Sequence, residues 1–273
     1  MNVQTQSTSA QETRFVSTKL GEIAVYTKSA NISDADKTPV IFLHGVYFDH
    51  HLWSNQVAAI NDRTVFTMDM PWHGGSKEGV PEHWTLEDCG EMLIEIMDVL
   101  DIPTLIAIGH SWGSMTILRA AAKYPERFAA VGFCNMPFEA ATTKQKLTFH
   151  LQHSALMLRN FYMNQTGKVL FGKKTLQQAP ELLNVLKTSM VKLSNKEIRL
   201  TDEYVILNAQ DDAPLVKKMH VPALALKGKE DYVPAPPTLQ TTIVRGGHIS
   251  PIESPLEVTE FCQRVMELEK TQR

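Results

Sequence analysis

The chain has 273 residues, of which 43% are hydrophobic and 21% charged, so it fits one large domain or a core with an inserted subdomain. A net charge of −3 without a basic stripe argues against a nucleic-acid partner. The sequence has no run of about 18 apolar residues, so we expect no membrane partner.

The N-terminal segment, residues 1–13, is polar and rich in Ser, Thr and Gln. It lacks the apolar stretch of a secretory signal, so we predict a flexible tail on a cytoplasmic protein. The three cysteines, Cys89, Cys134 and Cys262, are widely spaced and show no metal-ligand spacing. This pattern favours a reducing compartment and predicts no metal site.

Strand and helix patterns alternate from residue 14 onward. Residues 14–28 alternate around Leu20-Gly21-Glu22 and predict a hairpin. Four apolar runs predict buried strands, over 39–43, 63–68, 104–108 and 128–134. Helical spacing separates these runs, over 52–60, 85–100 and 114–124. Thr85 and Asp88 form a capping-box-like helix start. The alternation predicts an α/β fold, with a mostly parallel central sheet flanked by helices on both faces.

The alternation breaks after residue 137. Residues 138–217 show amphipathic helical patterns and no convincing strand. Strand patterns resume over 221–226 and 241–244, and a closing helix is predicted over 257–269. We therefore predict a helical insert, 138–217, within a core made of residues 14–137 and 218–273.

The turn after strand 104–108 carries the sequence Gly109-His110-Ser111-Trp112-Gly113, which matches the G-x-S-x-G nucleophile elbow. A serine at such a sharp strand-to-helix turn has a strained backbone, and a Cβ at either flanking glycine would clash. The helix that follows adds a positive field and free amides, which stabilise a developing oxyanion. We predict Ser111 as the nucleophile.

A serine nucleophile needs a base, and His248 is the candidate. It lies in Arg245-Gly246-Gly247-His248, after the last predicted strand and before the closing helix. For the other histidines near motifs we favour structural or surface roles. The His110 side chain should point away from the nucleophile. His50 and His51 are adjacent and do not have the spacing of a metal pair. His44 precedes the loop glycine and is interpreted as a structural residue.

The acid that orients the base should lie at the carboxyl edge of the sheet. Asp231, in Gly228-Lys229-Glu230-Asp231, follows strand 221–226 and is our choice. Glu230 is its immediate rival, and Glu139, just after strand 128–134, is a second alternative. Asp211 and Asp212 precede the strand and are interpreted as turn or cap residues.

An oxyanion needs two converging donors. The amide of Trp112 is one candidate, and the amide of Val46, in His44-Gly45-Val46-Tyr47, is the other. Aromatic residues on loops at one sheet edge favour a pocket lining. The predicted substrate-pocket residues are Tyr47, Trp72 and Phe138.

These motifs resemble those of the α/β-hydrolase superfamily. His44-Gly45 is similar to its oxyanion loop, and Gly247-His248 to its base loop. The segment Asp69-Met70-Pro71-Trp72-His73-Gly74-Gly75-Ser76 is similar to its D-x-P-G-H-G-x-S segment. The resemblance implies that residues 138–217 form a cap over the active site. It also supports Asp231, because the acid of this family is usually the Asp of the G-x-x-D turn.

The chain departs from the family pattern at two places. Trp72 stands where the family commonly has glycine, which would put a bulky ring near the pocket. Asp231 and His248 are close in sequence, and three prolines argue against the usual intervening helix: Pro234, Pro236 and Pro237. A serine at the elbow, in place of aspartate, argues against the dehalogenase and epoxide hydrolase branches.

The sequence therefore predicts a carboxylic ester hydrolase with a Ser-His-Asp triad, which cleaves a small ester or lactone through an acyl-enzyme on Ser111. The alternatives are a hydrolase of carbon–carbon bonds in a diketone-like substrate, or a slow hydrolase used as a ligand sensor. A cofactor-free oxygenase is a remoter option. We expect no cofactor and no metal, and a monomer or homodimer whose partner is a small ester-like molecule.

Overall fold

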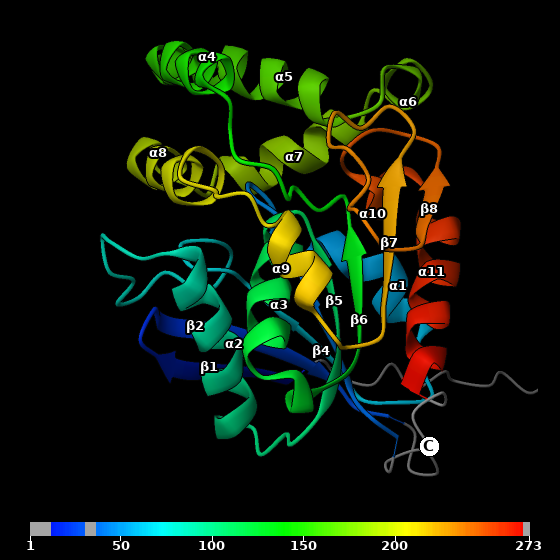
Figure 1. Cartoon of the computed structure of the whole chain (residues 1–273). Helices are drawn as coiled ribbons and strands as arrows, with labels where there is room; N and C mark the ends of the chain where they lie inside the picture. Colours follow the sequence, from blue (N-terminus) through cyan, green and yellow to red (C-terminus); the bar gives the residue numbers. More distant parts are fainter. Residues whose placement is uncertain (1–11, 31–36, 270–273) are drawn as a thin grey trace, which may run out of the picture.

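The computed structural model describes residues 12–30 and 37–269 (Figure 1). Their eight strands form one sheet in the order β1-β2-β4-β3-β5-β6-β7-β8. Only the β1–β2 and β2–β4 pairs among them are antiparallel, so the predicted mostly parallel sheet is confirmed. The strands are β1 (Glu12–Thr18), β2 (Gly21–Lys28), β3 (Val40–Leu43), β4 (Val65–Met68), β5 (Leu105–His110), β6 (Phe128–Cys134), β7 (Ala223–Gly228) and β8 (Thr241–Val244).

Helices lie on both faces of the sheet, as predicted (Figure 1). One group consists of α2 (Leu86–Val99), α3 (Trp112–Lys123) and α9 (Ala213–Lys218); the other consists of α1 (Ser54–Ala59), α10 (Ser250–Glu253) and α11 (Pro255–Glu267). Strands β3 and β5 are buried along their whole length between these layers. Burial on both faces explains why their sequences are continuous apolar runs.

A further layer of helices, the helical insert, connects β6 to β7 beyond the carboxyl ends of the strands (Figure 1). It contains α4 (Thr143–Ser154), α5 (Arg159–Leu170), α6 (Lys173–Gln178), α7 (Leu182–Met190) and α8 (Asn195–Thr201), with η4 (Ala155–Met157) and the π-helix η5 (Asp202–Leu207) as links. Short 3-10 turns occur elsewhere at η2 (His50–Trp53) and η3 (Pro125–Arg127). The division into a core and a cap domain stays a prediction.

Several element boundaries differ from the prediction. Strand β1 begins at Glu12, inside the segment predicted as a tail, and residues 1–11 lie outside the described part of the chain. Helix α3 begins at Trp112, directly after Ser111, and not at Ser114. Helix α11 begins at Pro255, because proline at the first helical position is preorganised for a helix.

Two local predictions are confirmed. Thr85 and Asp88 form a full capping box at the start of α2, with 2.8 Å from the Thr85 amide nitrogen to Asp88 Oδ2. The residues between β7 and β8 form no helix, as the prolines indicated. None of the helices in the described ranges is long and apolar enough to cross a membrane.

Candidate active site

Ser111 lies at the turn from β5 into α3. Its backbone has φ 50° and ψ −113°, which is a strained conformation for a residue with a side chain. A Cβ on Gly109 would lie 2.4 Å from the carbonyl carbon of Gly113, and a Cβ on Gly113 would lie 2.3 Å from the carbonyl oxygen of Leu43. The turn therefore requires glycine on both sides of the serine.

The structure brings the three predicted catalytic side chains into one chain of hydrogen bonds. His248 Nε2 lies 3.0 Å from Ser111 Oγ, and His248 Nδ1 lies 2.9 Å from Asp231 Oδ1. All three residues are buried. They follow β5, β7 and β8 at the carboxyl edge of the sheet, so parallel strands that are far apart in sequence place them together.

Asn135 supports the acid and was not predicted. Its Nδ2 donates to Asp231 Oδ2 at 2.8 Å, while the Val233 amide donates to Oδ1 at 3.0 Å. Burial alone would raise the pKa of Asp231, but the adjacent His248 and the hydrogen bonds from His248, Asn135 and Val233 hold that pKa below its usual value. The carboxylate is therefore ionised and keeps the His248 Nδ1 proton in place.

The rival acids lie elsewhere. Glu230 is exposed and accepts a hydrogen bond from the Lys173 amide at 3.0 Å. Glu139 is exposed and lines a cavity near Ser111, without a hydrogen bond to the base. His248 Nδ1 pairs with Asp231 instead.

Asp211 and Asp212 differ from one another. Asp211 accepts from the Ala213 amide at 3.0 Å, as a turn residue does. Asp212 stands at the N-cap position of α9, but its side chain does not cap the helix. Its carboxylate instead forms a buried bidentate ion pair with Arg119, at 2.8 and 3.0 Å, which was not predicted.

His110 and His44 have structural contacts. His110 Nε2 donates to the backbone carbonyl of His248 at 2.7 Å, and burial lowers the pKa of His110 to about 3. His44 Nδ1 donates to the carbonyl of Gly45 at 2.7 Å, and its Nε2 accepts from the Met70 amide at 2.9 Å. Both rings therefore support the loops around Ser111.

The predicted oxyanion donors belong to the loops that follow the adjacent strands β3 and β5. Val46 follows β3 and Trp112 is the first residue of α3, where a helix leaves its amide unpaired. Neither amide has a hydrogen-bond acceptor among the described residues. A Cβ on Gly45 would lie 3.0 Å from Ser111 Cβ, so the β3 loop passes against the nucleophile. Their role as an oxyanion hole stays a prediction.

The base loop is held by Glu253, which was also not predicted. Its buried carboxylate accepts from the amides of Gly247, Ile249 and Gly172, at 2.8 to 3.1 Å. The first two amides flank His248, and the third belongs to the helical insert. One carboxylate therefore ties the base loop to the insert.

A cavity of about 310 Å³ opens beside Ser111. Core and insert both line it, and its residues are Val46, Ser111, Met115, Pro137, Phe138, Glu139, Ala140, Ala141, Thr142, Gln145, Val205, Ile206, Ala209, Tyr232, Val233 and Pro234. Most of this lining is apolar, as in ordinary small-molecule sites. Its single charged residue is Glu139.

Of the residues predicted for the pocket, Phe138 lines this cavity, while Tyr47 and Trp72 do not. Trp72 has φ 67° and is buried, with its ring centre 5.5 Å from that of Trp84. The Tyr47 hydroxyl donates to the buried carboxylate of Asp202 in η5. Both rings pack between the core and the insert. Their positions on loops did not predict this packing.

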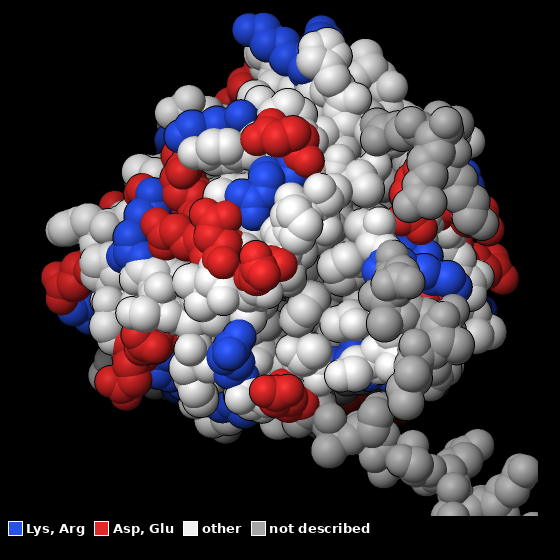
Figure 2. All heavy atoms as spheres, turned by 90° about the horizontal axis from the view of Figure 1, so that it is seen from below, with Lys and Arg blue, Asp and Glu red and all other residues white. Residues whose placement is uncertain are grey.

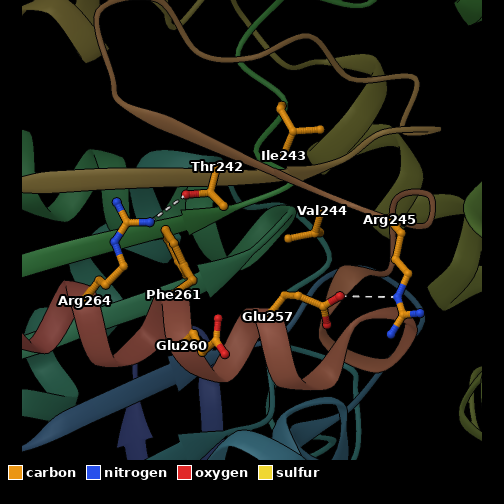
Figure 3. A pocket seen from close by; sticks show the side chains of 8 residues that line it. All are labelled: Thr242, Ile243, Val244, Arg245, Glu257, Glu260, Phe261 and Arg264. Carbon is orange, nitrogen blue, oxygen red and sulfur yellow. Dashed lines mark hydrogen bonds and ion pairs between the residues drawn. The ribbon is translucent and has the colours of Figure 1, made fainter.

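A larger hollow, of about 460 Å³, lies between β8 and α11 (Figure 3). An ion pair from Arg245 Nε to Glu257 Oε1, at 3.3 Å, and a hydrogen bond from Arg264 to Thr242, at 3.1 Å, cross it. No serine, cysteine or histidine lines it. It therefore lacks the nucleophile and base that the smaller cavity holds.

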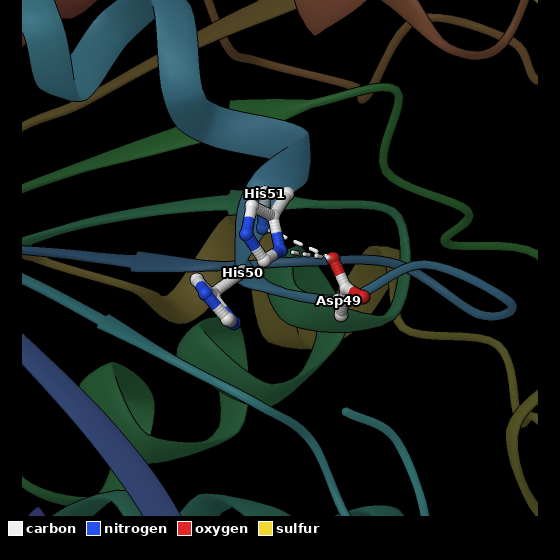
Figure 4. Close-up of side chains that lie close together, drawn as sticks. All are labelled: Asp49, His50 and His51. Carbon is white, nitrogen blue, oxygen red and sulfur yellow. Dashed lines mark hydrogen bonds and ion pairs between the residues drawn. The ribbon is translucent and has the colours of Figure 1, made fainter. Parts of the chain in front are cut away.

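Asp49, His50 and His51 form a cluster whose ligand atoms are close enough to hold a metal ion (Figure 4). His50 Nδ1 lies 2.9 Å from Asp69 Oδ1, and His51 Nδ1 lies 3.1 Å from Asp49 Oδ1. A ring nitrogen that faces a carboxylate at this distance carries a proton. Hydrogen bonds to carboxylates thus explain why these side chains lie close together.

Comparison with known proteins agrees with this architecture. A family model described as "alpha/beta hydrolase fold" matches residues 38–155. The chain is 32% identical to 3-oxoadipate enol-lactonase 1 of Acinetobacter baylyi, over 40% of this chain and 41% of that protein. It is 23% identical to 3-oxoadipate enol-lactonase 2 of the same organism, over 87% of this chain and 91% of the relative.

Solved structures share the fold over nearly the whole length. An esterase from Thermogutta terrifontis superposes with a TM-score of 0.79 at 19% identity, covering 95% of this chain and 99% of the esterase. The enol-lactonase from Burkholderia xenovorans gives a TM-score of 0.78 at 19% identity, covering 90% and 97%.

The sheet, its flanking helices and the strained serine turn define this chain as an α/β-hydrolase-fold protein, as its motifs predicted. Within that class the chain is similar to lactonases and esterases.

Proposed function

We propose that the protein is a serine hydrolase that cleaves a small carboxylic ester or lactone. The observation that carries this proposal is the hydrogen-bond chain from Ser111 through His248 to Asp231. The similarity to enol-lactonases and esterases supports a hydrolase of the ester or lactone type. The volume of the cavity beside Ser111 suits a small substrate.

In the first half of the reaction, His248 Nε2 takes the proton of Ser111 Oγ while that oxygen attacks the substrate carbonyl carbon. The amides of Val46 and Trp112 stabilise the oxyanion. As the tetrahedral intermediate collapses, its bond to the leaving oxygen breaks and protonated His248 gives the proton to that oxygen. An acyl group then remains on Ser111.

In the second half, His248 takes a proton from a water molecule, whose oxygen attacks the acyl carbon. Collapse releases the carboxylic acid, and Ser111 regains its proton from His248. Asp231 stays ionised throughout, which keeps the imidazole oriented and stabilises its protonated form.

We further propose that residues 138–217 act as a cap over this site. The insert supplies about half of the cavity lining, from residues 138–142 before α4, from the first turn of α4, and from η5 and the segment after it. A cap of this kind excludes water and selects substrates by shape. The cytoplasmic location and the small-molecule partner stay predictions from the sequence.

The test is a Ser111→Ala variant, with Ser154→Ala as the matched control because Ser154 is an exposed serine at the end of α4. Ser111→Ala should abolish turnover of short p-nitrophenyl esters and labelling by a fluorophosphonate probe, while the control keeps both. Retained turnover in folded Ser111→Ala protein would overturn the proposal. Labelling of Ser111 combined with turnover of a vinylogous diketone, but not of esters, would favour carbon–carbon bond cleavage.

A further inference from the structure

The charge of the helical insert is strongly asymmetric. From residue 140 to residue 180 the sequence contains no Asp or Glu, although the whole chain has a net charge of −3. The same stretch contains six basic residues, Lys144, Lys146, Arg159, Lys168, Lys173 and Lys174. Such an excess of basic over acidic residues favours an anionic partner.

The same stretch exposes large apolar side chains. Six of them are strongly exposed: Leu147 (61%), Leu151 (67%), Met157 (86%), Leu158 (67%), Phe161 (53%) and Val169 (59%). Leu147 and Leu151 are four residues apart on α4, so they share one side of that helix. Phe161 and Val169 are likewise on one side of α5. Exposed apolar residues gathered in this way mark an interaction surface.

Helix α4 itself has no buried residue. Helix α4 is joined through η4 to α5, and both lie farthest from the central sheet (Figure 1). We name the exposed side chains of α4, η4 and α5 the α4–α5 face; it consists of Leu147, Leu151, Met157, Leu158, Phe161 and Val169 with Lys144, Lys146 and Lys168.

The three lysines of this face form no ion pair with a carboxylate of the described residues. The opposite side of the molecule differs, because acidic and basic side chains are interspersed on it (Figure 2). Arg159 is excluded from the face, since its guanidinium donates to Asn195 and to backbone carbonyls. The ammonium groups of the face are thus free for an external anion.

We propose that the α4–α5 face docks on the surface of an anionic lipid bilayer. A protein surface that exposes Leu, Met and Phe beside lysines can bind such membranes, with the apolar side chains among the acyl chains and the lysines at the head groups. Long lysine stems can reach the head groups while Leu and Phe side chains insert. We expected no membrane partner because the sequence has no membrane-spanning run. Docking on the surface of a bilayer does not require such a run.

Charge argues against a second copy as the occupant. A two-fold interface would bring the α4–α5 face against itself and bury its lysines against a surface that carries no carboxylate. The face also adjoins the cavity, since Thr142 and Gln145 at the start of α4 line it. A bound bilayer would therefore lie near the cavity beside Ser111.

The test is co-sedimentation of the full chain with phosphatidylcholine vesicles, with and without phosphatidylglycerol. The wild type should pellet only with the anionic vesicles. Lys144→Gln/Lys146→Gln should weaken binding roughly thirty-fold, since each lysine contributes about five-fold. The matched control is Lys217→Gln/Lys218→Gln on α9, because these lysines are exposed but outside the face.

An apolar pair of variants completes the design. Phe161→Asp should abolish binding, while Leu256→Asp, at an exposed site on α11, should not. Circular dichroism checks that each variant is folded. Three results would overturn the proposal: equal binding to neutral vesicles, unchanged binding of Lys144→Gln/Lys146→Gln, or a concentration-dependent dimer that Phe161→Asp dissociates in the absence of vesicle binding. The readout does not involve hydrolysis, so it is independent of the proposed function.

Discussion

The Nε2 atom of His110 lies 2.7 Å from the backbone carbonyl oxygen of His248. Because a carbonyl oxygen only accepts, Nε2 carries the proton, and the lowered pKa of His110 keeps the ring neutral. His110, the residue before the nucleophile, thus fixes the backbone of His248 through this hydrogen bond. The elbow positions both partners of the proton transfer.

Replacing His110 should therefore disturb the base while leaving substrate binding intact. His110→Phe leaves the His248 carbonyl without its donor, and kcat should fall about ten-fold with little change in KM. His110→Gln, which can still donate, should retain more activity. Steady-state kinetics on a p-nitrophenyl ester measures this difference, and equal kinetics of His110→Phe and wild type would contradict it.

The pKa of Asp231 predicts a pH dependence of stability. Because its folded pKa is lowered, the ionised carboxylate stabilises the fold above the unfolded pKa of about 3.9, and this contribution is lost as pH falls through the folded pKa. The difference in unfolding free energy between wild type and Asp231→Asn should thus shrink as pH falls below about 4. Urea unfolding across this range tests it. A difference independent of pH would count against it.

Glu253 should matter for both stability and activity. Glu253→Gln replaces a buried charged acceptor of three amides, so the free energy of unfolding should fall by about 2 kcal/mol. Glu257→Gln is the control, since its ion pair with Arg245 is exposed and contributes under about 1 kcal/mol. Denaturant unfolding compares the two variants. Equal losses would contradict the assigned role of Glu253.

Tyr47 connects the loop of Val46 to the helical insert. Its hydroxyl donates to Asp202, and its amide donates to His73 Nε2 at 3.2 Å. Tyr47→Phe should loosen the loop and lower kcat about ten-fold, because a displaced oxyanion donor acts mainly in the transition state. Tyr162→Phe removes another hydroxyl from the same carboxylate, at 3.3 Å, but it leaves the hydrogen bond from Tyr47 to Asp202 in place and should lower kcat less than Tyr47→Phe does. Steady-state kinetics measures kcat of the two variants, and equal values would contradict this role of Tyr47.

Glu139 should set a preference by substrate charge. It is the one charged residue that lines the cavity, so anionic esters should be poorer substrates than neutral esters of the same size. Glu139→Lys should raise the ratio of kcat/KM for anionic over neutral esters by roughly thirty-fold, since it removes one repulsive contact and adds one attractive contact of about 1 kcal/mol each in water. A matched pair of esters with and without a carboxylate measures it. An unchanged ratio would contradict the prediction, because it would mean that the charge at position 139 is too far from the bound substrate to act on it.

The parts of this protein that could be predicted from its sequence are those with local causes. Alternating strand and helix patterns predicted the sheet and its layers, because burial on both faces imposes apolar runs. Gly109 and Gly113 predicted the elbow, because a Cβ at either position meets backbone. The positions of His248 and Asp231 followed from the strands that precede them.

Tertiary structure alone decided the residues that support them. Asn135 reaches Asp231, and Glu253 reaches the amides around His248, only because loops after different strands converge at one sheet edge. For the same reason Tyr47 and Trp72 pack between core and insert and do not line the cavity. Local pattern determines which residues stand at a strand end, but the packing of distant segments determines what their side chains touch.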